Sequence, residues 1–212
     1  MTHTRLVFLR HGQTEWNLLG KLQGQADIDL DEVGEQQAVE AARFFQQWSF
    51  DACYTSDLKR ALRTAQMVAT PHGIDAVPDA RLREINVGTW SGLTAAEASA
   101  ELPRLAELYN KGIDFRRSPA GETQAEMVRR ALPAMHEIMG QHEGQQILIV
   151  THGLLLASIV AALVGGRDDA SMLGIPENTC YSTVTVRGGK PWLMTHNAVS
   201  YTHLTLPTIY SV

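Results

Sequence analysis

Two stretches of the chain decide its fold: residues 6–12, which run LVFLRHG, and residues 147–153, which run ILIVTHG. Each begins with a continuous apolar run, as buried strands of a parallel sheet do. Each then ends in a histidine followed by a glycine. Ligands of open α/β sheets bind beyond the carboxyl ends of the strands. If the two strands are adjacent and parallel, His11 and His152 meet at one rim of the sheet.

The rest of the chain alternates short apolar strands with segments of helical spacing. We expect further strands at 52–54 and 74–77, and a β-hairpin formed by 181–186 and 191–195, with the first strand at 5–9 and the central one at 146–151. Expected helices are 30–48, a helix from an N-cap at Ser56 or Asp57 to Ala69, then 95–101, 103–110, 121–139 with a kink at Pro133, and 153–164. This order predicts a three-layer α/β/α sandwich whose sheet is mostly parallel, with an antiparallel edge.

The length of 212 residues favours a single domain. We expect this domain to span 1–199, with an irregular insertion at about 89–123 that forms a lid over the site. Residues 200–212 show neither strand nor helix periodicity, so we interpret them as a tail that is either frayed or not native to the protein.

Composition and charge narrow the function classes. The net charge of −5 gives no electrostatic reason to expect binding to nucleic acid or to an anionic membrane. The longest nearly apolar stretch, 154–164, is far shorter than the ~20 residues of a membrane span. Cys53 and Cys180 lack metal-like spacing and suit buried thiols in a reducing compartment. We therefore expect a cytoplasmic protein, monomeric or homodimeric.

An isolated histidine is usually a surface or hydrogen-bonded residue, and we interpret the other six in this way. His11 and His152 differ because of their paired context. Each is followed by a glycine, which lets backbone approach a ligand closely, and the free N–H groups at the start of the helix after His152 favour an anion. Arg10 would repel a metal cation, and no acidic residue flanks either histidine, so we expect no metal and no cofactor.

These residues resemble the histidine phosphatase superfamily, in its phosphoglycerate mutase-like branch. The resemblance rests on ordered motifs from residue 5 to about 155: Arg10-His11-Gly12 followed by Thr14, Asn17 and Gln23-Gly24; 55–61 (TSDLKRA); 82–84 (LRE) with 88–92 (GTWSG); 121–123 (GET); and 151–153 (THG). Thr123 stands where many members of the family have serine, which keeps the hydroxyl. Ser91 replaces a residue that is commonly acidic.

The resemblance implies a role for each motif residue. His11 would be the nucleophile that forms a phosphohistidine, and it must attack as neutral imidazole. Arg10, Arg60 and His152 would bind the phosphoryl oxygens, as fixed donors that replace a metal. Glu84 would protonate the leaving oxygen and then activate water. The remaining expected substrate-binding residues are Asn17, Gln23, Gly24, Thr14, Gly153, Arg116 and Arg117.

Three of these assignments have simpler structural alternatives. Glu84 could be a surface carboxylate. Arg60 could belong to a solvated helix face, because Lys59 and Arg63 are its neighbours. Arg116 and Arg117 could be a solvated pair, or they could bind a substrate carboxylate, as paired arginines do in some mutase relatives.

The sequence after Glu84 resembles the phosphatase members of the family. We therefore favour hydrolysis of a small phosphorylated metabolite. One alternative is a mutase that moves a phosphoryl group between oxygens of a phosphoglycerate, and another is a non-catalytic module that binds a phosphorylated ligand.

Overall fold

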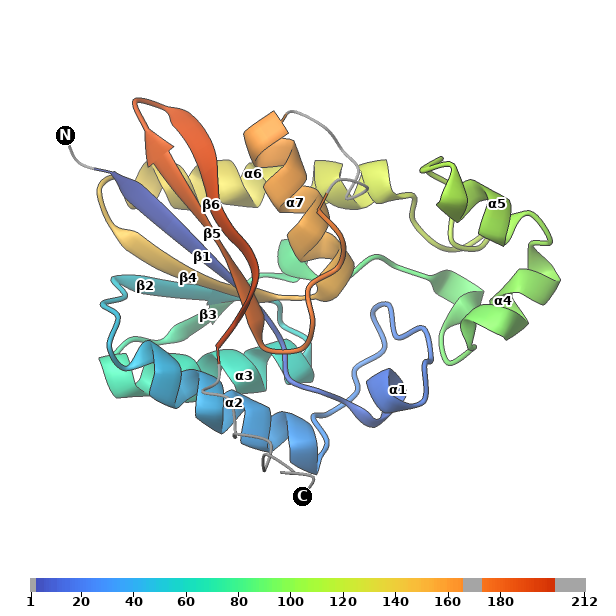
Figure 1. Ribbon diagram of the computed structural model, residues 1–212, viewed down its shortest axis with the longest axis horizontal. Coiled ribbons are helices and arrows are strands. Elements are labelled where there is room, and N and C mark those ends of the chain that lie inside the picture. Colours follow the sequence, from blue (N-terminus) through green and yellow to red (C-terminus); the bar gives the residue numbers. More distant parts are fainter. Residues whose placement is uncertain (1–2, 166–172, 201–212) are drawn as a thin grey trace, which may run out of the picture.

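The computed structural model describes residues 3–165 and 173–200 and shows a sheet covered by helices on both faces (Figure 1). The sheet has six strands in the order β3-β2-β4-β1-β5-β6. In chain order these are β1 (Thr4–Arg10), β2 (Ala52–Thr55), β3 (Ala76–Pro78), β4 (Gln146–Thr151), β5 (Cys180–Arg187) and β6 (Lys190–Val199). The first four strands pair in parallel, and β5 and β6 add an antiparallel edge. The predicted fold class is confirmed.

Strand β1 lies directly beside β4, in a register that pairs Leu6 with Ile147 and Arg10 with Thr151. Both strands are almost wholly buried, as their continuous apolar runs predict. Their side chains alternate between two cores: Leu6 and Phe8 belong to one, Val7 and Leu9 to the other. Because the register is in step, the residues that follow the two strands emerge at the same rim.

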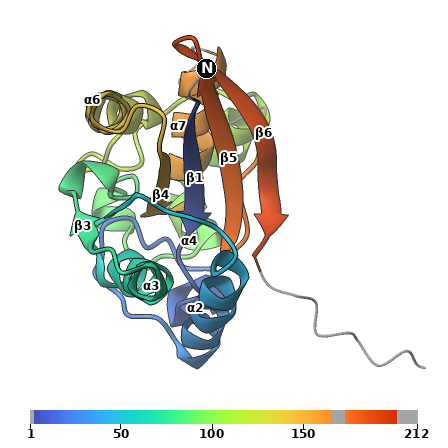
Figure 2. The same cartoon turned by 90° about the vertical axis from the view of Figure 1, so that its left-hand side faces the viewer.

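Helices α2 (Glu32–Phe45) and α3 (Lys59–Ala69) cover one face, and α6 (Gln124–Gln141) and α7 (Gly153–Gly165) cover the other. Figure 2, viewed from the side, separates these two helical layers. Helix α7 is apolar almost all round, which suits a helix buried between sheet and neighbours.

Several helix ends differ from those that the sequence predicts. Helix α3 begins after Leu58, which has no side-chain capping bond, so the expected cap at Ser56 or Asp57 is wrong. The carboxylate of Asp27, distant in the chain, accepts the N–H of Lys59 at 2.8 Å instead. Helix α6 begins later than predicted, after a capping box formed by Thr123 and Glu126.

Other boundaries shift by a few residues. Helix α2 begins after Asp31, whose side chain accepts the N–H of Gly34. Helix α6 continues through Pro133 to its end. The short helix α1 (Glu15–Leu18) was not predicted, because four residues are too few to show periodicity.

The expected insertion contains two short helices, α4 (Ala95–Glu101) and α5 (Leu105–Asn110), near the predicted positions. Figure 1 shows them extending away from the sheet beyond its rim. The indole of Trp90, just before α4, donates to Glu101 at its end, at 2.8 Å. The segment therefore has regular elements of its own.

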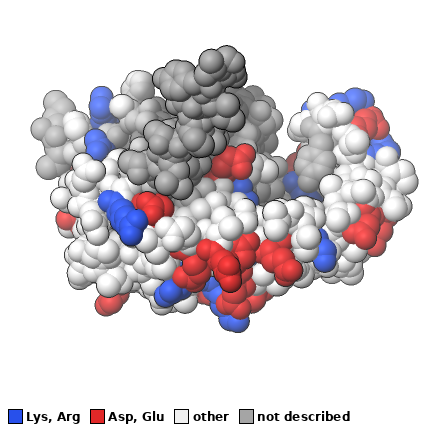
Figure 3. Space-filling model, turned by 60° about the horizontal axis from the view of Figure 1, so that its bottom comes forward, with Lys and Arg blue, Asp and Glu red and all other residues white. Residues whose placement is uncertain are grey.

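Ser200, the first residue of the expected tail, is buried and donates to the carbonyl of Thr179. It belongs to the fold, whereas the rest of that prediction, 201–212, lies outside the described residues. Within 3–165 and 173–200, no helix has the length and apolarity needed to cross a membrane. On the face shown in Figure 3, acidic side chains cover more of the surface than basic ones, in agreement with the net charge of −5.

Candidate active site

The two predicted histidines meet at the rim of the sheet. The rings of His11 and His152 lie edge to face, with 5.2 Å between their centroids. They follow paired residues of β1 and β4, and the N–H of His11 donates to the carbonyl of Thr151 at 3.0 Å. Both side chains are almost fully buried, with 3% of His11 and 0% of His152 exposed. The juxtaposition predicted from the two strand ends is confirmed.

Hydrogen bonds fix the tautomer of His11. Its Nδ1 lies 2.6 Å from the carbonyl oxygen of Gly12, which can only accept, so Nδ1 carries the proton. Its Nε2 lies 3.3 Å from Nε of Arg60, which can only donate. The lone pair of the imidazole therefore lies on Nε2. A neutral ring with this tautomer has a nucleophilic nitrogen.

The surroundings keep both histidines neutral. Burial holds the pKa of His11 well below its ordinary value, and the positive charges of Arg60 and Arg10 lower it further. The same causes lower the pKa of His152, burial again being the largest.

Arg60 is buried, with 1% of the residue exposed, so its interpretation as part of a solvated helix face is wrong. Its Nη1 and Nη2 donate to the carbonyls of Ala26 and Gly24 at 2.7 and 2.8 Å, while Nε faces His11. Burial lowers the pKa of Arg60 to about 10, so the guanidinium is still charged at neutral pH. Two backbone carbonyls thus hold a cation against the nucleophilic nitrogen.

Buried donors without protein partners surround this pair. Arg10 donates through Nη1 to the carbonyl of Pro176 at 2.6 Å, but its buried Nε has no partner among the described residues. Neither ring nitrogen of His152 has one among them. Buried polar groups in proteins are nearly always paired, so donors left over at one place mark a site that suits an anion.

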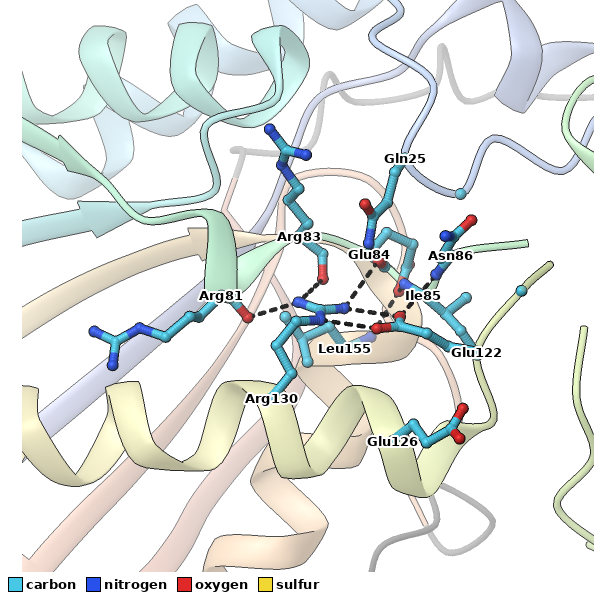
Figure 4. Close-up of polar contacts among 12 residues, drawn as sticks. Gln25, Arg81, Arg83, Glu84, Ile85, Asn86, Glu122, Glu126, Arg130 and Leu155 are labelled. Atoms are coloured by element: carbon cyan, nitrogen blue, oxygen red, sulfur yellow. Dashed lines mark hydrogen bonds and ion pairs between the residues drawn. The ribbon is translucent and has the colours of Figure 1, made fainter. Parts of the chain in front are cut away.

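Glu84 reaches the same site from the loop after the 3₁₀ turn Ala80–Leu82. Its carboxylate accepts the N–H groups of Leu154 and Leu155, in the first turn of α7, at 3.0 and 3.1 Å, and that of Ile85 at 2.9 Å (Figure 4). The sequence predicts an anion at this helix start, and the anion found there is the protein's own carboxylate. The expectation that those N–H groups are free is therefore wrong.

A cavity of about 220 Å³ opens at this point. Nine of the expected site residues line it: Arg10, His11, Asn17, Gln23, Gly24, Arg60, Glu84, Arg117 and Gly153. The buried ring of His152 contacts the ring of His11 and is not among the residues that line the cavity. Apolar side chains, including Leu22, Val87 and Trp90, complete the wall.

Two expected substrate-binding residues do not line the cavity. The hydroxyl of Thr14 caps α1 and accepts the side-chain N–H of Gln23 at 2.7 Å, so Thr14 supports residues that do line it. Arg116 is exposed and donates to Glu126 and to the carbonyl of Gly121. Its neighbour Arg117 is buried with its guanidinium 4.1 Å from the ring centroid of Phe115, so the adjacent arginines have separate roles.

The glycine after His11 also differs from expectation. A side chain on Gly12 would meet the carbonyl oxygen of Gly34 at 2.5 Å, so the close approach is to α2 and not to a ligand. Gly24 has a φ of +52°, and a side chain there would meet Val87 at 2.6 Å. Gly24 can thereby present its carbonyl to Arg60.

Besides the apolar wall, Asn178, Lys21 and Ile175 belong to the site and were not predicted. Asn178 donates to the carbonyl of His11 at 2.9 Å and so braces the nucleophile's backbone. Lys21 and Ile175 line the cavity. All three lie in segments without periodicity, where no sequence signal distinguishes them. Among the described residues, no group of three or more histidine, cysteine, aspartate or glutamate side chains could hold a metal ion.

The geometry agrees with the comparison to known proteins. The model of the histidine phosphatase superfamily (branch 1) matches residues 6–199, and the chain belongs to this family. It is 38% identical to a glucosyl-3-phosphoglycerate phosphatase of Mycolicibacterium vanbaalenii, over 76% of this chain and 74% of that one. It is 32% identical to a probable phosphoglycerate mutase of Yersinia enterocolitica, over 96% of both chains.

A solved structure supports the fold assignment. A phosphoserine phosphatase variant of Entamoeba histolytica, in complex with phosphoserine, superposes with a TM-score of 0.82 at 31% identity. The superposition covers 92% of this chain and 98% of the other.

Proposed function

We propose that the protein hydrolyses a small phosphomonoester through a phosphohistidine on His11. The observation that carries this proposal is the hydrogen bonding of His11: the carbonyl of Gly12 accepts the N–H of Nδ1, and the lone pair of Nε2 lies beside the cation of Arg60. A neutral, buried nucleophile among positive donors suits attack on an anionic phosphoryl group.

In the first step the ester phosphate binds against Arg10 and Arg60, which line the cavity beside His11, and against the neighbouring His152. Nε of Arg10 and the ring nitrogens of His152 have no partner among the described residues, which suits them to its oxygens. Nε2 of His11 attacks phosphorus, so that an N–P bond forms as the bond to the alcohol oxygen breaks. Glu84, whose carboxylate takes up a proton when the anionic substrate binds, transfers this proton to the departing oxygen, and the alcohol leaves the cavity.

In the second step water attacks the phosphohistidine. The carboxylate of Glu84 accepts a proton from this water as the new P–O bond forms and the N–P bond breaks. Inorganic phosphate leaves, and His11 returns to its neutral state. The arginines stabilise negative charge in both transition states, which is the task of metal ions in many other phosphoryl transferases.

We further propose that the alcohol half of the substrate carries a carboxylate. Arg117 and Lys21 line the cavity together with the phosphate-binding residues. Arg117 pairs with Asp114 at 3.4 Å, and we propose that it can also donate to a second anionic group of the substrate, beside the charge of Lys21. Three relatives, the Mycolicibacterium phosphatase, the Yersinia mutase and the Entamoeba phosphatase, are named for phosphoglycerate derivatives or phosphoserine, which are phosphorylated carboxylates.

The buried thiols of Cys53 and Cys180 form no disulfide and suit a reducing compartment, so we place the protein in the cytoplasm. We also propose that it acts without a metal or cofactor. Small phosphorylated metabolites are its proposed partners, and a monomer or a homodimer would serve this chemistry equally.

Release of 4-nitrophenol from its phosphate ester tests the proposal. We expect turnover that persists in excess EDTA and is abolished in His11→Asn. With the ³²P-labelled ester, the wild-type protein should carry the label after quenching without acid. Loss of turnover in EDTA would overturn the metal-independent mechanism. Turnover by His11→Asn at the wild-type rate would overturn the assignment of the nucleophile.

The mutase alternative is decided with 3-phosphoglycerate. A phosphatase releases inorganic phosphate, whereas a mutase forms 2-phosphoglycerate and must keep water away from the phosphoenzyme. Formation of 2-phosphoglycerate faster than phosphate would replace the phosphatase proposal by the mutase one. Release of phosphate without isomerisation would exclude the mutase.

A further inference from the structure

The loop that carries Glu84, residues 83–87, belongs to no helix or strand. Buried backbone groups need partners, so the carbonyls here must bond to side chains or water. The guanidinium of Arg130, from the middle of α6, binds two of them, the carbonyls of Arg83 and Glu84.

Arg130 has an acceptor for every N–H group of its guanidinium (Figure 4). Nη1 donates to the carbonyls of Arg81 and Arg83 at 2.8 and 3.1 Å. Nη2 donates to the carbonyl of Glu84 at 3.3 Å and to Oε2 of Glu122 at 3.0 Å, and Nε donates to Oε1 of Glu122 at 3.0 Å.

Glu122 extends this contact to the far side of the loop. It pairs with Arg130 through both carboxylate oxygens, and the same Oε2 accepts the N–H of Asn86 at 2.9 Å. In return, the N–H of Glu122 donates to the carbonyl of Asn86 at 2.7 Å. The backbone is thus held on both sides of Glu84.

We infer that Arg130 is a positioning residue, which fixes the backbone of Glu84 so that its carboxylate meets the leaving oxygen. This inference rests on the proposed role of Glu84 as the proton donor. Arg130 does not line the cavity, so it contacts the site through the loop and not through the substrate. Its positive charge also contributes to the lowered pKa of His152, and a lysine keeps that charge. Lysine cannot replace it, because an ammonium lacks the planar fork that reaches acceptors on two sides.

The test uses two aryl phosphates of almost equal size, 4-nitrophenyl and 4-methylphenyl phosphate. Nitrophenolate leaves readily without a proton, whereas methylphenolate needs the acid. We expect Arg130→Lys to lower kcat/KM for the methylphenyl ester by about 10- to 100-fold more than for the nitrophenyl ester, because small misplacements of a catalytic group cost up to about 10²-fold. This ratio does not depend on how much of the variant is folded.

Two further variants complete the experiment. Arg129→Lys, on the same helix with an exposed side chain, should leave the ratio unchanged. In a Glu84→Gln background, which should itself raise the ratio, Arg130→Lys should raise it no further, because residues that act as a unit are not additive.

Three results would overturn the inference, and they are distinguishable. Equal losses on both esters in Arg130→Lys would assign Arg130 a structural role alone and leave the proposed function intact. An unchanged ratio in Glu84→Gln would remove Glu84 as the acid, and the role of Arg130 with it. Hydrolysis of neither ester by the wild-type protein would reject the proposed function itself.

Discussion

Nε of Arg60 donates to Nε2 of His11 across 3.3 Å, and the rest of its guanidinium is held by backbone carbonyls. The contact places a charged donor beside the proposed nucleophile and makes it costly for His11 to become protonated. The same cation is available to a phosphoryl oxygen when the nitrogen attacks phosphorus. One residue can thus set both the protonation state of the nucleophile and the charge of its surroundings.

Replacing Arg60 with lysine should therefore lower kcat strongly. An ammonium cannot bond to Gly24, Ala26 and His11 at once, and loss of one fixed donor to developing charge costs about 10²–10³-fold in kcat. Steady-state hydrolysis of 4-nitrophenyl phosphate measures this. The matched control is Arg63→Lys on the same helix, where the exposed side chain pairs with Glu35 and should not affect kcat. If Arg60→Lys keeps the kcat of the wild type, the planar guanidinium of Arg60 is not needed for catalysis.

Acidification should destabilise the fold through the buried histidines. The pKa values of His11 and His152 are lowered in the folded state, so below about pH 6.5 the unfolded chain binds protons that the folded chain does not. The free energy of unfolding then decreases as pH falls, by up to about 1.4 kcal/mol per pH unit for each histidine.

Urea unfolding of wild type and His11→Asn between pH 7.5 and 5 measures this slope. Because the variant lacks one of the two buried histidines, its free energy of unfolding should fall less steeply with pH, by the slope that one proton contributes. If the free energy of unfolding falls with the same slope in both proteins, the pKa of His11 is not lowered in the folded state. Since His11 stays neutral when the pH falls through the ordinary pKa of histidine, its protonation should not lower kcat/KM of the wild-type enzyme there.

The two adjacent arginines should respond differently to substitution. Arg117→Ala should raise KM for a carboxylate-bearing ester such as 3-phosphoglycerate by about 10- to 100-fold, the value of a charged hydrogen bond, and should change KM for 4-nitrophenyl phosphate much less. Arg116→Ala should change neither, because its side chain contacts Glu126 outside the cavity. Equal effects of Arg117→Ala on both substrates would argue against a carboxylate site.

Thr123→Ala should destabilise the protein by about 1 kcal/mol, because the hydroxyl of Thr123 accepts the N–H of Glu126 and caps α6. Thr123→Ser keeps the hydroxyl and should retain most of the stability. Chemical denaturation at one pH compares the three proteins. If serine and alanine destabilise equally, the methyl group and not the cap is what matters at this position.

The sequence alone determined the strands that build the site. Continuous apolar runs at 6–9 and 147–150 predicted buried parallel strands, and the histidine–glycine pair after each predicted a shared rim. Such signals can be read from the sequence because the burial of consecutive residues requires them to be apolar. The order of motifs likewise led to the correct family.

Tertiary structure alone decided which residues meet across long distances in the chain. Asp27 binds the first N–H of α3, Glu84 occupies the start of α7, and Arg130 holds the loop of Glu84. Arg116 and Arg117 are adjacent in sequence, yet one pairs with Glu126 and the other lines the cavity. The periodicity of the sequence does not predict such contacts. Each forms only when distant segments pack together and leave a polar group that needs a hydrogen-bond partner.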